Sequence, residues 1–497
     1  MKKGLLAIGA LFAICLSMLV IDMVVKQKNG EDWKINVDDV EEVFFEENAN
    51  IPEESTVVDE SETFLLFNIL SDSTAEVTRD DSGDDSSYLG HDSITIPEKV
   101  RIDGIEYAVT SIEAEAFVYN YTLKSIDVPD CVTNIGEYAF SGCSSLEPKL
   151  LVYDKGTKCY GWIGDNKKCT DVVIPDGVTS IGDRAFDYCR SLASIEIPDG
   201  VTSIGYAAFD GCSSLTSIKI PESVTSIGAG AFYGCDSLEP KLLVYDKGTK
   251  CYGWIGDKKK CTDVVIPDGV TSIGARAFYG CDSLTSIKIP DGVTSIGAGA
   301  FRDCDSLTSI KIPEGVTSIG ASAFYKCSKL ASIKIPDGVT SIGEDAFYGC
   351  RSLASIEIPE GVTSIGYAVF YGCSNLASID IPEGVTSIGE SAFSGCSSLA
   401  SIDIPEGVTS IRNRAFSGCS SLTSIKIPES VTSIREGAFD YCSSLASIDI
   451  PESVTSIGEE AFSGCTNLDV KIDNSKDNVK VGGAAFEGCK SVTWLKD

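Results

Sequence analysis

Apolar and polar residues alternate along most of the chain in one pattern that returns every 23 residues. Residues 191–212 show it as SLASIEIPDGVTSIGYAAFDGC. Within this copy, Ile195 and Ile197 have the spacing of side chains that share one face of a strand. The proline that follows has no backbone N–H to donate to a neighbouring strand, so it ends the element. We therefore predict a short strand over residues 192–197.

The second half of each copy predicts two further pieces. The segment x-G-V-T-S-I-G reads as a turn and a second short extended piece, after which Gly182 and its equivalents give the backbone freedom for the next bend. The segment A-F-x-x-C, with Ala185, Phe186 and Cys189 as its recurrent apolar positions, predicts a single helical or 3₁₀ turn.

A fixed period in the twenties is typical of a solenoid, because one such unit cannot bury its apolar face alone and stacks on its neighbours. The expected architecture is a stack of coils with a parallel β-sheet along one face. The proline of the pattern recurs at Pro175, Pro198, Pro221, Pro267, Pro290, Pro313, Pro336, Pro359, Pro382, Pro405, Pro428 and Pro451.

A phenylalanine column gives the number of coils. After residue 67, phenylalanine occurs only in this register, at Phe117, Phe140, Phe186, Phe209, Phe232, Phe278, Phe301, Phe324, Phe347, Phe370, Phe393, Phe416, Phe439, Phe462 and Phe486. Two gaps, after Phe140 and after Phe232, span 46 residues each, which is twice the period. One divergent coil in each gap brings the count to 17 coils around a continuous core of rings.

The consensus I-P-x-x-V-T-S-I-G-x-x-A-F-x-x-C-x-x-L resembles the leucine-rich repeat, and most closely its BspA-like branch of bacterial and protozoan surface proteins. The resemblance covers roughly residues 94–497. It implies a solenoid without catalysis, with a role in adhesion or recognition outside the cell. The repeat pattern by itself predicts only the solenoid.

Most of the 20 cysteines fall in one column, three residues after the phenylalanine, where we expect buried thiols that pack as small apolar side chains. The column comprises Cys143, Cys189, Cys212, Cys235, Cys281, Cys304, Cys327, Cys350, Cys373, Cys396, Cys419, Cys442, Cys465 and Cys489. Two spaced pairs stand apart. Cys159 with Cys169, and Cys251 with Cys261, are candidates for disulfides if the compartment is oxidising.

The N-terminal region points to export. Two lysines precede an uncharged stretch over residues 4–21, which fits a signal peptide or an uncleaved membrane anchor within residues 1–25. Residues 31–93 then hold 20 Asp or Glu against Lys34 and Arg79. We expect an acidic disordered spacer over residues 26–61.

The solenoid is expected over residues 94–489, with a cap at each end because open ends expose apolar surface and unpaired strands. Within residues 62–93, FLLFNIL and TAEVT predict a hairpin cap. A second hairpin is expected around Asp103 and Gly104, and residues 490–497 are expected to form the C-terminal cap.

The repeats show no catalytic, metal-binding or cofactor-binding constellation. The chain has one histidine, His91, so Ser-His and Cys-His dyads and the usual zinc spacings are missing from the repeats. The net charge of −33 would repel nucleic-acid phosphates. Asp and Glu recur at the turns of the repeats. Two of these carboxylates could act as acid and base, so a hydrolase is the third alternative for the function.

One outward column of the predicted strands carries blocks of like charge. They are Lys288, Lys311 and Lys334, followed by Glu357, Asp380 and Asp403. Like charges stacked about 5 Å apart repel one another, so stability alone does not favour such blocks. We hypothesise a bipolar strip that binds a protein partner of complementary charge. The alternative is that near-identical copies inherited their charges by duplication.

The divergent coils, residues 147–169 and 239–261, are a second candidate. They are near-identical, and both place aromatic side chains beside lysines. The aromatic residues are Tyr160 and Trp162, then Tyr252 and Trp254. Exposed rings next to cations suit glycans or a protein patch, whereas buried rings would fill the space of the missing phenylalanine. A regular column of Thr and Ser hydroxyls is a third possible binding surface.

These features together predict an exported, non-enzymatic solenoid that recognises a host matrix protein, a cell-surface protein or a glycan. It would contact a membrane only through its N-terminal segment. The alternative is a purely structural spacer or envelope module.

Overall fold

The computed structural model describes residues 23–26, 32–35, 57–79 and 88–496, in two units, Met1–Thr56 and Val57–Asp497. In the first unit, β1 (Met23–Lys26) and β2 (Asp32–Ile35) form an antiparallel pair. The region expected to be a disordered spacer therefore contains strand β2. The uncharged stretch expected to direct export lies outside the described residues.

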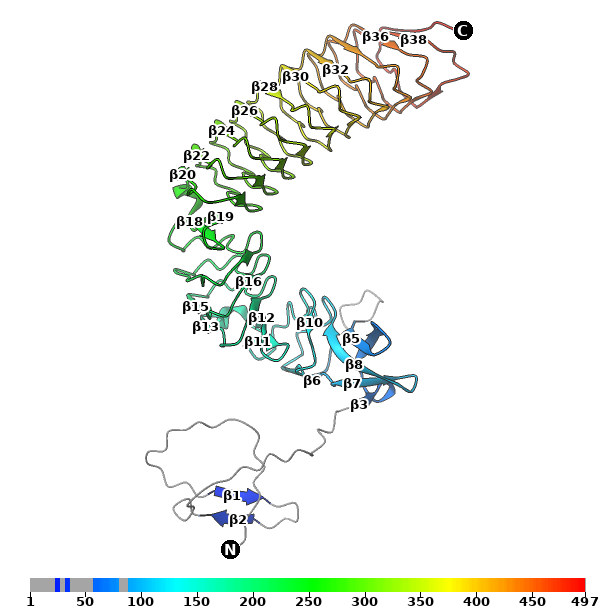
Figure 1. The fold of residues 1–497 in the computed structure, drawn as a ribbon. Helices are drawn as coiled ribbons and strands as arrows, with labels where there is room; N and C mark the ends of the chain where they lie inside the picture. The colour runs from blue at the N-terminus through cyan, green and yellow to red at the C-terminus, as the bar shows by residue number, and fades with distance from the viewer. Residues whose placement is uncertain (1–22, 27–31, 36–56, 80–87, 497) are drawn as a thin grey trace. The chain divides into compact units, whose positions relative to one another are not determined.

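The second unit is a stack of coils, drawn from blue to red in Figure 1. Two ladders of short strands run along the stack. The first ladder consists of β6 (Ser93–Thr95), β9 (Ser125–Asp127), β13 (Asp171–Val173), β15 (Ser194–Glu196), β20 (Asp263–Val265), β22 (Ser286–Lys288), β24 (Ser309–Lys311), β26 (Ser332–Lys334), β28 (Ser355–Glu357), β30 (Ser378–Asp380), β32 (Ser401–Asp403), β34 (Ser424–Lys426), β36 (Ser447–Ile450), β38 (Asp469–Ile472) and β40 (Ser491–Trp494).

The second ladder follows the V-T-S-I-G segments. It consists of β8 (Ile105–Ile112), β10 (Asn134–Ile135), β12 (Lys158–Ile163), β14 (Ser180–Ile181), β16 (Ser203–Ile204), β17 (Ser226–Ile227), β19 (Lys250–Ile255), β21 (Ser272–Ile273), β23 (Ser295–Ile296), β25 (Ser318–Ile319), β27 (Ser341–Ile342), β29 (Ser364–Ile365), β31 (Ser387–Ile388), β33 (Ser410–Ile411), β35 (Ser433–Ile434), β37 (Ser456–Ile457) and β39 (Lys480–Val481). These coils confirm the predicted solenoid.

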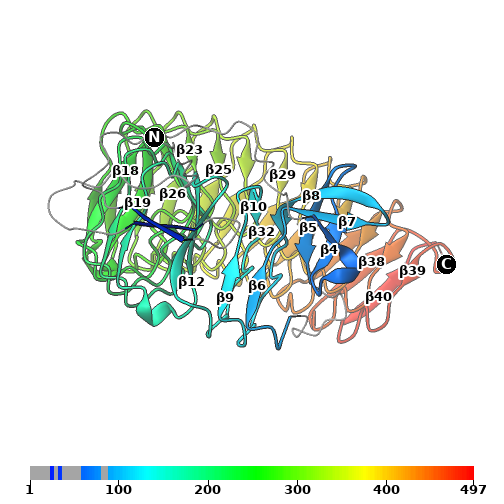
Figure 2. The same cartoon turned by 90° about the horizontal axis from the view of Figure 1, so that it is seen from below.

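Strands of consecutive coils run parallel, one period apart. In the first ladder most of them pair two by two, whereas the strands of the second ladder form sheets of five or six strands. In the first ladder, β28 and β30 align Ile356 with Ile379, and both side chains point into the core while their neighbours are exposed. Figure 2 shows β6 and β9 of this ladder side by side. The predicted strand is present but shorter, Ser194–Glu196 instead of 192–197, and its alternation of exposed and buried side chains is confirmed.

The third side of each coil differs from the prediction, because the A-F-x-x-C segment is not a helical turn. Arg184 and Tyr188 adopt positive φ angles of 55°, and the backbone N–H of Phe186 donates to the carbonyl of Ala208 in the next coil at 2.7 Å. Every second backbone N–H of the segment thus bonds to the neighbouring coil. The N–H groups between them close turns within the segment; for example, the Cys189 N–H donates to the Phe186 carbonyl at 3.0 Å.

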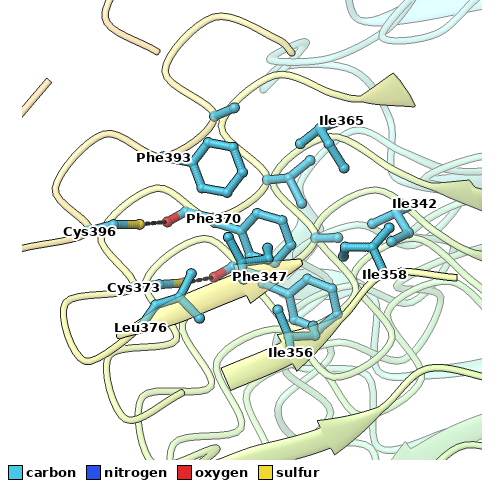
Figure 3. Packing of buried hydrophobic residues seen from close by; sticks show 14 of the residues in the cluster. Ile342, Phe347, Ile356, Ile358, Ile365, Phe370, Cys373, Leu376, Phe393 and Cys396 are labelled. Atoms are coloured by element: carbon cyan, nitrogen blue, oxygen red, sulfur yellow. Dashed lines mark hydrogen bonds between the residues drawn. The ribbon is translucent and has the colours of Figure 1, made fainter. Parts of the chain in front are cut away.

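The phenylalanine rings stack along the core. Phe347, Phe370 and Phe393 are fully buried, with ring centroids 5.6 and 5.4 Å apart and nearly parallel planes (Figure 3). This separation falls within the range of offset stacking. The thiol of Cys373 donates to the Phe347 carbonyl at 3.2 Å. The cysteine column therefore satisfies buried carbonyls as well as filling space.

The core is divided into three segments rather than being continuous. The first extends from Leu65 to Ile163, the second from Cys159 to Ile255, and the third from Cys251 to Ala485. Each division coincides with one of the divergent coils, where the column of phenylalanine rings is interrupted.

A mixed sheet closes the N-terminal side of the stack. Its order is β3 (Val57–Asp59), β7 (Lys99–Ile102), β8, β5 (Thr74–Thr78) and β4 (Leu66–Ile69). Both expected hairpins are present, since β4 pairs antiparallel with β5 and β7 with β8. β5 pairs with β8, so it covers the open edge of the second ladder. The cap begins earlier than expected. β3 lies within residues 26–61, the region expected to be a spacer, and the 3₁₀ helix η2 (Glu60–Glu62) spans the expected boundary at residue 62.

Candidate recognition sites

The charged strip lies on the first ladder, where all six of its side chains are exposed. Two like-charged pairs are in direct register: Lys311 with Lys334, and Glu357 with Asp380. The structure thus brings the predicted strip residues onto one face, in the order that the sequence predicts.

Acidic residues at the turns after the strands compensate part of the lysine block. Lys334 Nζ lies 3.5 Å from Glu314 Oε1 of the preceding coil. Further along the same column, Lys426 Nζ lies 3.0 Å from Glu406 Oε1. Within the described part of the chain, Lys288 and Lys311 form no ion pair within 4.0 Å, so they are the least compensated cations of the strip.

Each divergent coil contains a hairpin followed by a 3₁₀ turn. The first comprises β11 (Lys149–Tyr153), β12 and η3 (Asn166–Lys168), and the second β18 (Lys241–Tyr245), β19 and η4 (Lys258–Lys260). Gly161 and Gly253 are required in these hairpins, because a Cβ atom there would collide with the carbonyls of Ala185 and Ala277.

The tyrosines of the hairpins occupy the space of the missing phenylalanines. The Tyr252 ring packs edge-on against Phe232 at a centroid distance of 5.4 Å, and its hydroxyl accepts the Phe232 backbone N–H at 3.0 Å. Tyr160 meets Phe140 in the same way, at 5.5 Å. Burial raises the pKa of both phenols. Of the two roles considered for these aromatic residues, the tyrosines therefore have the buried one: they fill the space of the missing phenylalanines.

The tryptophans are half-buried, and their polar ends are occupied. Trp162 Nε1 donates to the Asp165 carbonyl and Trp254 Nε1 to the Asp257 carbonyl, each at 3.2 Å. One part of each indole still faces solvent, so these rings lie at the edge of a surface rather than projecting from it.

The disulfides considered for the hairpins are absent: all four cysteines are free and buried. Cys159 aligns with Ile181 in the second ladder, whereas Cys169 lies beside Cys189 at the cysteine column. Cys251 and Cys261 are separated in the same manner. The two cysteines of each pair belong to different sides of the coil, which explains why they do not bond.

A pocket opens at each hairpin, on the side of the phenylalanine segments. The first pocket, of about 150 Å³, is lined by Tyr138, Tyr160, Trp162, Asn166, Arg184 and Asp187, among others. The second pocket, of about 260 Å³, is lined by Tyr206, Tyr233, Trp254, Lys258, Arg276 and Arg302, among others. Most of these residues flank the phenylalanine column at variable positions, and sequence reasoning missed them.

In the first pocket the arginine is paired with a carboxylate, although Arg184 Nε and Asp187 Oδ1 are buried without a hydrogen-bond partner. Arg184 Nη1 lies 3.3 Å from Asp187 Oδ2, and the guanidinium is held between the rings of Tyr138 and Tyr206, at 4.8 and 5.2 Å from their centroids. Asn166 Nδ2 donates to the Asp187 carbonyl at 3.2 Å. Burial raises the pKa of the Asp187 carboxyl, against the opposing effect of Arg184.

The second pocket contains three cations against one carboxylate. Arg276 Nη1 donates to the Tyr206 hydroxyl at 3.2 Å, and Lys258 Nζ donates to the Trp254 carbonyl at 2.8 Å. Arg302 lies 4.2 Å from the centroid of Tyr325. The carboxylate is Asp210, whose pKa is raised by burial.

The Thr column supports the stack itself. The Thr202 hydroxyl donates to the Thr179 carbonyl at 3.2 Å, and the bond is repeated one coil on by Thr225 at 3.4 Å. These hydroxyls link neighbouring coils, so they have a structural role whatever else they contact.

A sequence model of the BspA type leucine rich repeat region matches residues 93–155, 156–243, 256–377 and 363–493. The chain belongs to the BspA-type leucine-rich repeat family. Among curated proteins, none matches the sequence.

Two solved structures of similar proteins share 31% sequence identity with this BspA-type chain. A leucine-rich repeat protein from Bacteroides ovatus ATCC 8483 covers 82% of this chain and 98% of its own, with a TM-score of 0.44. A leucine rich cell surface protein from Faecalibacterium prausnitzii A2-165 covers 84% and 94%, with a TM-score of 0.40. In the described part of the BspA-type chain, no helix is long and apolar enough to cross a bilayer.

Proposed function

We propose that this chain is exported, displayed at the cell surface, and recognises a protein partner through the charged strip, without catalysis. The observation that carries the proposal is the exposed column of three lysines followed by three carboxylates on one ladder, in which Lys311 pairs directly with Lys334 and Glu357 with Asp380. Membership of a family that includes a protein described as a leucine rich cell surface protein supports the location.

The charges of the strip lower the stability of the fold. Glu357 and Asp380 occupy directly paired positions of adjacent strands, where like charges repel. Lys288 and Lys311 likewise lie in consecutive strands of the ladder, at the same position of each. A partner with the opposite order of charges would relieve both repulsions at once and would be steered to the strip over a distance of about a Debye length.

The test is binding of the full chain to immobilised extracellular-matrix proteins and glycans. The triple variant Lys288→Glu, Lys311→Glu, Lys334→Glu should lose roughly tenfold in affinity for a protein that the unaltered chain binds, and the loss should shrink as salt rises. A matched control changes Lys476, Lys480 and Lys490 to Glu, which alters net charge equally away from the strip. Equal affinities of the two triple variants would overturn the proposal.

A further inference from the structure

The two pockets descend from one duplicated unit, which makes their differences informative. The hairpins are identical except that Asn166 in the first corresponds to Lys258 in the second, 92 residues on. The same offset relates Arg184 to Arg276, and both arginines line their pockets. Both pockets therefore contain the arginine, but the residues around it differ.

Two carboxylates that line the first pocket have no counterpart at the second. Counting 92 residues onward, Asp183 becomes Ala275 and Asp187 becomes Tyr279. Asp210 lines the second pocket itself, together with Arg302, the residue 92 positions after it. Arg184 therefore has a carboxylate partner, whereas Arg276 bonds only to a neutral hydroxyl among the described residues. The lining of the second pocket has gained Lys258 and Arg302 as well.

The second pocket is consequently cationic in a chain of net charge −33. Arg276 is exposed. Arg302 is half-buried, and its Nε lies 3.5 Å from Asp303 Oδ2. Guanidinium groups present paired donors that match the two oxygens of a carboxylate. The exposed guanidinium of Arg276, which has no carboxylate partner among the described residues, is available to an anion that enters from solvent.

Aromatic faces and hydroxyls complete the lining. The rings of Tyr233 and Tyr279 stack at a centroid distance of 5.3 Å, and Trp254 adds a half-buried indole. The negative face of an aromatic ring attracts the weakly positive C–H groups of a saturated ring. The tyrosine hydroxyls can bond to a ligand's own hydroxyls. A volume of about 260 Å³ is close to the lower limit of small-molecule sites, so it suits one ring.

We infer that the second pocket binds a carboxylated sugar ring, such as a uronic acid unit of an acidic glycan. This inference deepens the proposed recognition function by naming a ligand class at a site separate from the charged strip. A sugar is favoured over an acidic peptide because the lining contains aromatic rings and hydroxyls but no open strand edge to bond a peptide backbone. The first pocket, with Arg184 paired to Asp187, is the built-in control.

The experiment titrates the full chain with methyl β-D-glucuronide and with methyl β-D-glucoside, followed by saturation-transfer NMR. We expect the glucuronide to bind with a Kd on the order of 1 mM, as a single ring with few contacts should, and the glucoside at least about tenfold more weakly. Arg276→Gln should weaken glucuronide binding about tenfold or more. Arg184→Gln, the matched change in the first pocket, should leave it unaltered.

Exchanges between the copies sharpen the test. Tyr279→Asp gives Arg276 the partner that Arg184 already has, so glucuronide binding should fall, while Asn166→Lys with Asp187→Tyr should create a second binding site. The thermal midpoint of each variant reports folding. Equal binding of glucoside and glucuronide, tighter binding of an acidic tetrapeptide, or an unaffected Arg276→Gln variant would overturn the inference. The proposed function fails separately, through the lysine variants of the strip.

Discussion

The hydroxyl of Tyr252 accepts the backbone N–H of Phe232 at 3.0 Å, in the place where coils such as that of Phe209 use a backbone carbonyl. In the regular coils this N–H bonds to the next coil, as Phe209 does to Ala231 at 2.8 Å. The divergent coil supplies no carbonyl at this place, and a phenol on the inserted hairpin provides both the acceptor and the ring. The Tyr252 side chain thus supplies the missing acceptor and covers the Phe232 ring at the coil where the core divides.

The first prediction concerns this bond. Tyr252→Phe keeps the ring but leaves a buried N–H without an acceptor, which should destabilise the protein by about 1–3 kcal/mol. Tyr160→Phe should cost less, because its oxygen is 3.4 Å from the Phe140 nitrogen. Chemical unfolding measures both, with the exposed Tyr371→Phe as control. Equal stability of Tyr252→Phe and the control would show that the hydroxyl is dispensable.

The second prediction concerns the phenylalanine stack. Phe370 is fully buried between two rings, so Phe370→Ala should cost about 3–5 kcal/mol. Phe486 is only partly buried and has one stacked neighbour at 5.8 Å, so the same change there should cost clearly less. Thermal unfolding of the two variants gives the comparison. A larger loss at Phe486 would contradict a core built by stacking from both sides.

The third prediction concerns thiol reactivity. Among the described cysteines, Cys131 and Cys489 are half-exposed and the remainder are buried. The native protein should therefore be alkylated by iodoacetamide first at these two positions, and at the others only after unfolding in urea. Burial raises the pKa of Cys489 to about 11, which keeps even its reaction slow at neutral pH. Early alkylation of Cys373 in peptide mass spectra would contradict the buried column.

The fourth prediction concerns alkaline pH. Burial raises the pKa of the Cys373 and Cys419 thiols from 9.0 to about 12. Above about pH 9 the unfolded chain loses these protons while the folded chain keeps them, so stability should fall with rising pH until about pH 12. Each thiol contributes up to about 1.4 kcal/mol per pH unit.

Urea unfolding between pH 8 and 10 measures this slope. The double variant Cys373→Ala, Cys419→Ala should be less stable at pH 8 but should lose stability less steeply as the pH rises. Parallel pH profiles of the variant and the unaltered chain would show that these thiols do not carry the effect.

The repeat period makes the interior predictable. Ile356, Phe370 and Cys373 recur at fixed offsets, and a stack of similar coils leaves only one inward face for them. The third side was predicted wrongly, because its conformation depends on hydrogen bonds between coils, such as that from Phe186 to Ala208. A single copy of the sequence resembles a local turn and carries no sign of that partner.

The candidate sites were predictable only in part. The charged strip follows directly from alignment of the copies, since one of the two outward positions of each first-ladder strand holds serine in most copies and the other varies in charge. The second pocket combines Tyr206, Lys258 and Arg276 from three coils, and its shape arises where a hairpin interrupts the stack. A comparison of the flanks of the two hairpins, 92 residues apart, would have revealed the loss of Asp187 opposite the retained arginine.

The last prediction concerns the acidic half of the strip. It tests whether these charges serve binding of a partner or were only inherited when the repeats duplicated. Asp380 is exposed, pairs directly with Glu357 and precedes Asp403 in the ladder. Asp380→Lys replaces two repulsions by two attractions, so it should stabilise the fold by about 0.5 kcal/mol at low salt and by less at high salt. The same variant should bind the protein partner more weakly. Ser378→Thr, on the same strand, is the control for local perturbation. A destabilised Asp380→Lys variant would refute the claim that the strip opposes stability, and with it the reason for assigning the strip to recognition.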